Sequence, residues 1–134
     1  MRAGYIDTSV LVGIAFDEPA VASIIRVVKS FDRLYSATLL EAEFLAAASR
    51  EGVLDQALTL LRPIRWVFPT RRLTDEVFSI LDRGYLRGTD LHHLSTALYL
   101  FPDASQAFFL TLDKKQSRMA QSLGFKTLSS GEEG

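Results

Sequence analysis

Short apolar segments of strand length alternate along this chain with longer segments of helical pattern. The apolar segments are AGYID (3–7), RLYSA (33–37), IRWVF (64–68), AFFLTL (107–112) and FKTL (125–128). Strands that are separated by helices are joined by crossovers, and such crossovers are right-handed. The pattern therefore predicts a mostly parallel sheet with helices on both faces, which is a three-layer α/β/α sandwich.

Helices are expected over residues 8–16, 18–31, 38–50, 54–62, 74–86, 89–101 and 114–124. Pro19 suits the start of the second helix, because its missing N–H has no helical partner there. Gly52 can end the third, and Thr74 and Thr89 are expected to cap the helices that follow them. AFFLTL is an almost continuous apolar run, which is typical of a central parallel strand.

The chain has 134 residues, which fits one domain. We expect that domain to span residues 1–128 and residues 129–134 (SSGEEG) to form a loose tail. Hydrophobic residues make up 48% of the chain, enough for a sizeable core. With 15 basic and 16 acidic residues, the net charge does not indicate a nucleic-acid partner, so any such contact must come from a local patch.

The chain contains no cysteine, which excludes disulfides, thiolate metal sites and cysteine catalysis. This composition suits a reducing compartment, and we expect a cytoplasmic protein. The longest apolar run near the N-terminus, VLVGIAF (10–16), is too short to span a bilayer. We therefore expect neither a signal peptide nor a membrane anchor.

Four acidic residues occupy positions that the expected fold brings near one another. Asp7 ends the first strand, and Asp113 directly follows AFFLTL. Ligands of open parallel sheets bind outside the carboxyl ends of the strands, so both aspartates are expected at one sheet edge. Asp90 lies in the first turn of its helix, and Glu43 has only apolar neighbours three and four residues away, which are Leu39, Leu40, Ala46 and Ala47.

Buried carboxylates are costly unless a cation or metal compensates their charge. A cluster of oxygen ligands without cysteine suits Mg²⁺ or Mn²⁺. Because Mg²⁺ usually shares its coordination shell with substrate phosphates, hydrolysis of a phosphodiester is the chemistry that this cluster favours. Each acid alone also has a structural explanation. Asp7 can cap a helix, and Asp90 can be an acid of the first turn that the helix dipole favours. Asp113 can belong to a turn, and Glu43 can pair with an arginine.

Four segments together resemble the signature segments of PIN-domain ribonucleases. They are YIDTSVLV, SATLLEAEFLAA, TDLHHLSTAL and FLTLDKKQSRMAQSLGF, in the family's order and at its usual spacing. The likeness runs from Tyr5 to about Leu128, and the compact length is most similar to the VapC-like toxins of toxin–antitoxin pairs. The resemblance implies a PIN-like fold, metal-dependent endoribonuclease activity on RNA, an antitoxin partner and frequent homodimerisation.

The resemblance also implies roles for individual residues. Asp7, Asp90 and Asp113 correspond to metal ligands, and Glu43 binds metal or orients the attacking water. Ser9 and Thr111 correspond to small hydroxyl residues beside the first and last aspartates. His93 matches a histidine that is frequent in this helix, and we do not assign it to catalysis. Independently of the resemblance, Lys114 and Lys115 directly follow Asp113, where they can hold substrate phosphates.

Two assignments have close competitors. Glu41 competes with Glu43 for the acidic helix position, and the resemblance favours Glu43, because an acid followed directly by bulky apolar residues fits the family pattern. Of the adjacent His92 and His93, we expect one to face the core and the other to face solvent. Adjacent helical residues project about 100° apart, which argues against a shared zinc site.

Three other functions compete with the nuclease. A PIN-like module that binds RNA or protein without catalysis is the main alternative, and the complete acidic quartet argues against it. A haloacid-dehalogenase-like phosphatase needs a second aspartate two places after the first, where this chain has Ser9. A response-regulator receiver needs paired acids near the end of the first strand and a phosphoacceptor on a middle strand, and neither is present.

Overall fold

The computed structural model describes residues 1–16 and 21–128 of the chain. In these residues one sheet of parallel strands forms, in the order β3-β2-β1-β4. The strands are β1 (Ala3–Ile6), β2 (Arg33–Ala37), β3 (Ile64–Val67) and β4 (Phe108–Leu110). Tyr5 in β1 pairs with Tyr35 in β2 on one side and with Phe109 in β4 on the other. The prediction of a parallel sheet is confirmed.

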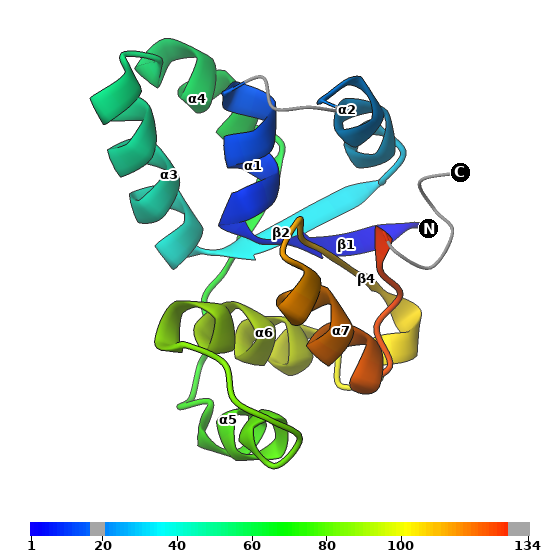
Figure 1. The fold of residues 1–134 in the computed structure, drawn as a ribbon. Helices are drawn as coiled ribbons and strands as arrows, with labels where there is room; N and C mark the ends of the chain where they lie inside the picture. The colour runs from blue at the N-terminus through cyan, green and yellow to red at the C-terminus, as the bar shows by residue number, and fades with distance from the viewer. Residues whose placement is uncertain (17–20, 129–134) are drawn as a thin grey trace.

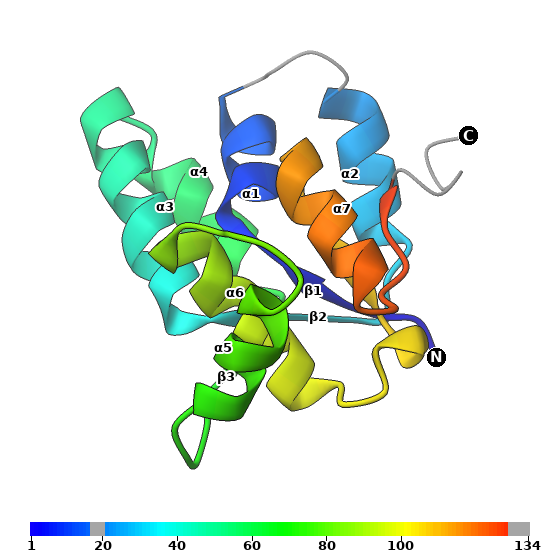
Figure 2. The same ribbon diagram turned by 60° about the horizontal axis from the view of Figure 1, so that its bottom comes forward.

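Helices cover both faces of this sheet (Figure 1). The α-helices are α1 (Thr8–Ala15), α2 (Val21–Lys29), α3 (Thr38–Glu51), α4 (Leu54–Leu61), α5 (Thr74–Leu81), α6 (Gly88–Leu100) and α7 (Lys114–Ser122). Helices α1 to α4 lie on one side of the sheet, and α5, α6 and α7 lie on the other (Figures 1 and 2). The molecule is therefore the three-layer α/β/α sandwich that the sequence predicts.

Each layer of helices closes its own hydrophobic core. Successive residues of a strand point to opposite faces of the sheet. Ile6 and Leu110 accordingly belong to the core under α1 to α4, whereas Tyr5 and Phe109 belong to the core under α5 to α7. The rings of Tyr5 and Phe109 stack with their centroids 5.5 Å apart. Burial on both faces explains why these short strands read as continuous apolar runs.

The structure corrects the prediction for the last two strands. β4 is an edge strand of the described sheet, not a central one. The predicted strand FKTL (125–128) forms only one parallel bridge, between Lys126 and Phe108. The apolar character of β4 reflects helices on both its faces, and not a second strand paired along its length.

Several predicted helix ends also differ from the structure. Thr74 lies inside α5, whose N-cap is Leu73, and Thr89 lies inside α6, whose N-cap is Arg87; neither cap residue caps its helix through a side-chain hydrogen bond. α5 ends at Leu81 and not at residue 86, ahead of a turn in which glycine, a weak helix former, occurs.

Two further predictions concern the residues Gly52 and Pro19. Gly52 ends α3 as expected, because its φ of 73° is in the left-handed region that favours glycine. Pro19, which was expected to start the second helix, lies outside the described residues, and so does the expected tail at 129–134.

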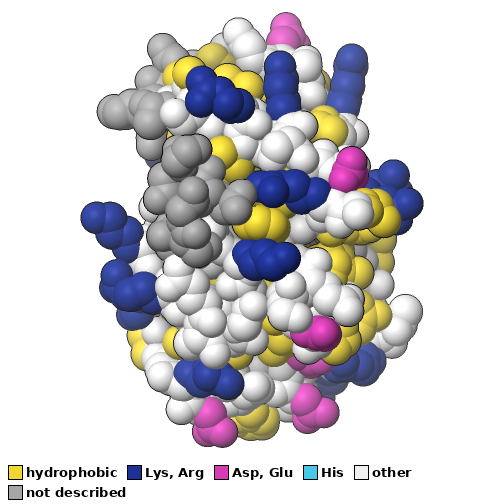
Figure 3. All heavy atoms as spheres, turned by 90° about the vertical axis from the view of Figure 1, so that its right-hand side faces the viewer, with side chains coloured by type: hydrophobic (Ala, Val, Ile, Leu, Met, Phe, Trp, Pro, Cys, Tyr) yellow, Lys and Arg dark blue, Asp and Glu magenta, His cyan; other side chains and the backbone are white. Residues whose placement is uncertain are grey.

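The surface mixes charges of both signs. Figure 3 shows the face that lies at the right of Figure 1, where lysine and arginine side chains are interspersed with acidic and hydrophobic ones. This distribution agrees with the nearly balanced charge of the sequence. Within residues 1–16 and 21–128, no helix is both long enough and apolar enough to span a membrane.

The buried aromatic side chain of α3 provides a test of the core under α1 to α4. Phe44 is fully buried in α3, and replacing it by alanine should lower the free energy of unfolding by about 3–5 kcal/mol. Phe78 is 65% exposed on α5, so Phe78→Ala should change it by no more than about 0.5 kcal/mol. Urea denaturation of both variants measures the difference, and similar losses for the two would contradict this description of the core.

Candidate active site

The sheet order places the carboxyl ends of β1 and β4 side by side. The chain leaves β1 toward β2 on one side, whereas β4 adds on the other side. Such a reversal of strand order is where open parallel sheets bind ligands. The backbone N–H of Asp7 donates a hydrogen bond to the carbonyl of Leu110, with an N–O distance of 3.1 Å. Asp7 is therefore attached at the carboxyl end of both strands.

Asp7 is the N-cap of α1. One oxygen of its carboxylate, Oδ1, accepts hydrogen bonds from the backbone N–H of Ser9 at 3.1 Å and from the Ser9 hydroxyl at 2.6 Å. The side chain is nonetheless almost buried, with 4% of the residue exposed. The capping role that Asp7 can fill alone is thus present in the structure, and it leaves the second carboxylate oxygen for other contacts.

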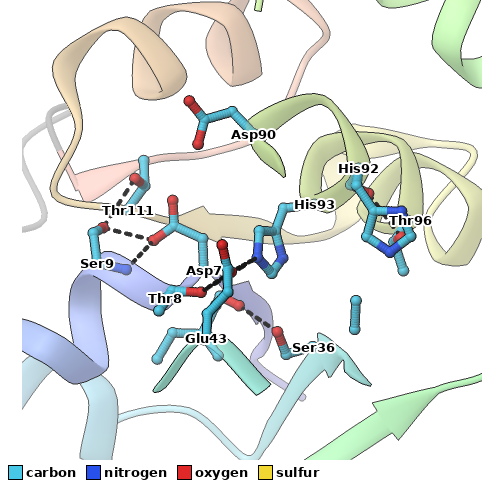
Figure 4. A network of polar contacts seen from close by, with 12 residues as sticks. Asp7, Thr8, Ser9, Ser36, Glu43, Asp90, His92, His93, Thr96 and Thr111 are labelled. Atoms are coloured by element: carbon cyan, nitrogen blue, oxygen red, sulfur yellow. Dashed lines mark hydrogen bonds and ion pairs between the residues drawn. The ribbon is translucent and has the colours of Figure 1, made fainter. Parts of the chain in front are cut away.

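Two hydroxyls link Asp7 to the end of β4. The Ser9 hydroxyl lies 3.3 Å from that of Thr111 and accepts a hydrogen bond from the backbone N–H of Leu112 at 2.9 Å. The Thr111 hydroxyl in turn accepts from the backbone N–H of Asp113 at 3.1 Å. This chain of contacts, visible in part in Figure 4, fixes the Asp113 backbone relative to Asp7.

Burial raises the pKa of the Asp7 carboxyl above its ordinary value. Hydrogen bonds from Ser9 and Thr111 and the charge of His93 act in the opposite direction without cancelling the effect of burial. In the part of the chain that the structure describes, no lysine or arginine forms an ion pair with Asp7. The position therefore favours a cation that would compensate the buried charge.

Glu43 reaches the same region from α3. Its Oε1 accepts a hydrogen bond from the Thr8 hydroxyl at 2.6 Å and lies 3.1 Å from Nε2 of His93. The side chain is 30% exposed, whereas Glu41 is exposed to solvent. Of the two competing glutamates, the structure thus turns Glu43 toward the residues around Asp7. Glu43 is held by a threonine and a histidine, and not by the arginine that was its structural alternative.

His93 connects Glu43 to the core. His93 is 2% exposed, and its Nδ1 lies 2.8 Å from the hydroxyl of Tyr5. The Tyr5 oxygen accepts a hydrogen bond from the backbone N–H of Ala37, and burial raises the pKa of this hydroxyl. The imidazole is thus held between the Tyr5 hydroxyl at Nδ1 and the Glu43 carboxylate at Nε2. His92 is exposed, so the prediction that one histidine faces the core and the other solvent is confirmed.

Asp90 lies across from Asp7 in the first turn of α6 (Figure 4). Its carboxylate accepts a hydrogen bond from Nε of Arg87 at 3.2 Å, and its side chain is 21% exposed. Its backbone carbonyl accepts from Nε2 of Gln116 at 3.0 Å. Gln116 is fully buried in α7, so this side chain joins the N-terminal turns of α6 and α7.

Asp113 is exposed at the start of α7. It is the N-cap of that helix, and its Oδ1 accepts from the backbone N–H of Gln116 at 2.9 Å. Lys114 and Lys115 follow it and are also exposed. Both cationic side chains thus begin at the same sheet edge as the acidic residues, at the mouth of the candidate site.

The predicted quartet is brought to one region but not into one coordination shell. Thr8, the residue after Asp7, donates a hydrogen bond to Glu43. Ser9 and Thr111 connect Asp7 to Asp113. Gln116 connects Asp90 to Asp113. Among the described residues, no three acidic or histidine side chains lie close enough to hold a metal as they stand. The donors nevertheless fit Mg²⁺ or Mn²⁺, because they are oxygens and Asp7 is buried without a cationic partner.

Sequence reasoning did not assign three residues of this network, which are Tyr5, Thr8 and Gln116. Tyr5 and Thr8 lie within two residues of Asp7 in the sequence, and this closeness is the signal that could have indicated their place in the network. Gln116 gives a weaker signal, because a glutamine three residues after an N-cap is common in exposed first turns. Only the packing of α6 against α7 shows that it is buried.

Comparisons with known proteins agree with the fold described above. The family model described as PIN domain matches residues 4–122. A chain of VapBC-1 from nontypeable Haemophilus influenzae shares the fold with a TM-score of 0.71 and 16% identity, over 96% of this chain and 100% of that chain. A chain of VapBC2 from Rickettsia felis, solved bound to a DNA fragment from their promoter, gives 0.66 and 12%, over 94% and 97%. No match was found among curated proteins.

Removing the buried charge should stabilise the metal-free protein. Because burial raises the pKa of the Asp7 carboxyl above its ordinary value, its ionisation costs stability once the pH exceeds that ordinary value, and the cost grows as pH rises until the carboxyl of the folded protein is ionised. Asp7→Asn keeps a good capping side chain and should therefore raise the Tm in EDTA at neutral pH. Added Mg²⁺ should raise the Tm of the wild type more than that of the variant.

Thermal scans of both proteins between acidic and neutral pH make this measurement. The gap between the two Tm values should widen as pH rises. A variant that is less stable than the wild type in EDTA at neutral pH would contradict the claim that the buried charge of Asp7 costs stability.

Proposed function

The chain belongs to the PIN domain family, and we propose that it is a metal-dependent endoribonuclease that hydrolyses RNA phosphodiester bonds as the toxin of a toxin–antitoxin pair. The observation that carries this proposal is Asp7, a carboxylate that is 4% exposed at the β1–β4 switch point without an ion pair to lysine or arginine in the described residues. The N-cap role accounts for the hydrogen bonds of Oδ1, but a helix cap does not require a buried carboxylate.

The four acids have distinct parts in this proposal. Asp7, Asp90 and Asp113 are the ligands for a divalent cation, and Glu43 binds it or orients the water that attacks the phosphorus. The Tyr5–His93 contact holds the Glu43 carboxylate in one orientation. Ser9 and Thr111 hold Asp7 by hydrogen bonds and line the path of the substrate.

A bound Mg²⁺ or Mn²⁺ would supply positive charge that stabilises the transition state of phosphodiester hydrolysis. The exposed Lys114 and Lys115, next to Asp113, would contact flanking phosphates of the RNA. Asp90 pairs with Arg87 in the structure. The proposal therefore requires that Asp90 leave Arg87 to bind the cation.

The proposed antitoxin would cover the acidic residues with an arginine. Support comes from the fold that this chain shares with chains of two VapBC structures. An apolar cavity of about 310 Å³ between α1, α2 and α4, lined in part by Leu11, Ile14, Ile25, Val28 and Leu60, has the character of a groove for an amphipathic helix. Action on RNA in the cytoplasm and homodimerisation belong to the same proposal.

A non-catalytic module that binds RNA or protein is the second candidate. The observation in its favour is that each acid already has a structural partner, since Asp7 and Asp113 cap helices, Glu43 accepts from Thr8 and Asp90 pairs with Arg87. Retained RNA binding without metal-dependent cleavage would select this function.

Cleavage should require both the metal and Asp7. With Mg²⁺ or Mn²⁺, wild-type protein freed of any antitoxin should cleave a mixed pool of transfer and ribosomal RNA, and EDTA should abolish this. Asp7→Asn should lose at least about 100-fold in rate while remaining folded. Equal cleavage by matched wild-type and variant preparations would identify a contaminating nuclease and contradict the proposal.

The two glutamates of α3 provide a matched comparison. Glu43→Gln should reduce the cleavage rate at least about tenfold, because the amide loses the negative charge and half of the acceptor capacity. Glu41→Gln, made on the exposed side of the same helix, should cleave like the wild type. Single-turnover rates on one RNA decide the assignment, and a larger loss from Glu41→Gln would reverse it.

A further inference from the structure

We infer that Tyr85 and Lys115 form a stacking site for one base of a single-stranded RNA, directly beside the acidic residues. This inference rests on the proposed function and names how the substrate is held. Tyr85 lies in the connection between α5 and α6 and is 70% exposed. Lys115, in the first turn of α7, places its Nζ 5.2 Å from the centroid of the Tyr85 ring.

The connection that carries Tyr85 is held against α7. Nη1 of Arg83 donates to the carbonyl of Ser122 at the end of that helix, at 2.8 Å. Gly84 lies so close to α7 that an added Cβ would be 3.3 Å from the terminal carbon of Met119. Figure 2 shows the α5–α6 connection running alongside α7. The exposed ring is therefore presented by an anchored segment.

Two short links join this ring to the acids. Arg87 follows Tyr85 by two residues, and its Nε lies 3.2 Å from the Asp90 carboxylate. Lys115 follows Asp113 by two residues on the other side. Short stretches of chain thus join the ring to the beginnings of α6 and α7, where Asp90 and Asp113 lie. A nucleotide stacked here would be a neighbour of the phosphate at the acidic residues.

The chemistry of the pair fits a nucleotide. An aromatic ring stacks on a base of any sequence, and a lysine beside it contacts the phosphate or the π face. Unstacked bases are accessible in single strands, whereas the bases of an A-form duplex are enclosed within the helix. The site is therefore expected to prefer single-stranded over double-stranded RNA.

Other exposed aromatic residues lack this setting. Phe68 is 71% exposed and Phe78 is 65% exposed, and within the described residues neither ring has a lysine or arginine over it. Lysine is depleted in protein–protein interfaces, so the lysine beside Tyr85 favours a polyanion over a protein surface as its ligand.

Fluorescence anisotropy of a labelled, short single-stranded RNA tests the site in EDTA, where no cleavage occurs. Tyr85→Ala should weaken binding about tenfold, the effect of losing one base stack. Tyr85→Phe keeps the stacking ring and should bind within about twofold of the wild type. Phe68→Ala, the control with equal exposure, should leave affinity unchanged, and duplex RNA of the same sequence should bind more weakly than the single strand.

The salt dependence identifies the role of the lysine. Lys115→Gln should reduce the slope of log affinity against log salt by about 0.7, as expected for one lost phosphate contact on a single strand. An unchanged affinity of Tyr85→Ala, an equal loss from Phe68→Ala, or absence of RNA binding by the wild type would overturn the site. A shift in oligomeric state by Tyr85→Ala in sedimentation, without loss of RNA binding, would overturn it in favour of a protein interface.

The two levels of the proposal fail separately. Binding that depends on Tyr85, in a protein that cleaves no RNA, would support the stacking site and reject the nuclease. Metal-dependent cleavage with binding that is independent of Tyr85 would support the nuclease and reject the stacking site.

Discussion

Burial of the Asp7 carboxylate between the ends of β1 and β4 is the constraint on which the rest of the site depends. Asp7 is 4% exposed, and burial raises the pKa of its carboxyl. Hydrogen bonds from Ser9 hold one oxygen and continue through Thr111 to the start of α7. These contacts lower the cost of burial, so the fold holds a buried carboxylate at the ends of the two paired strands.

The other acids are oriented by separate supports on rigid elements. The hydrogen bonds from Tyr5 through His93 fix Glu43 from the core side of the sheet. Gln116 joins the N-terminal turns that carry Asp90 and Asp113. Because each support uses side chains locked by packing, the relative positions of the elements are set before any ligand binds. Asp90, paired with exposed Arg87, is the member with the most freedom to change partner.

The sheet and most helices could be predicted from the sequence because strand-length apolar runs and helical patterns alternate without ambiguity. The place of Asp7 at the carboxyl ends of the strands followed from the same pattern. The edge position of β4 could not be predicted, since a strand covered on both faces reads the same at the edge as in the centre. Contacts such as Tyr5 with His93, which are 88 residues apart, depend on packing between layers and leave no local signal.

The measurement that tests the central claim most directly is a crystal structure of the protein grown with Mn²⁺, with the ion located from its anomalous scattering. We predict a peak bound by the second carboxylate oxygen of Asp7, with Asp90 turned away from Arg87 toward the ion. A structure that shows no manganese at Asp7, with the ion bound elsewhere or absent and the Asp90–Arg87 pair intact, would contradict the claim that this buried carboxylate exists to hold a metal.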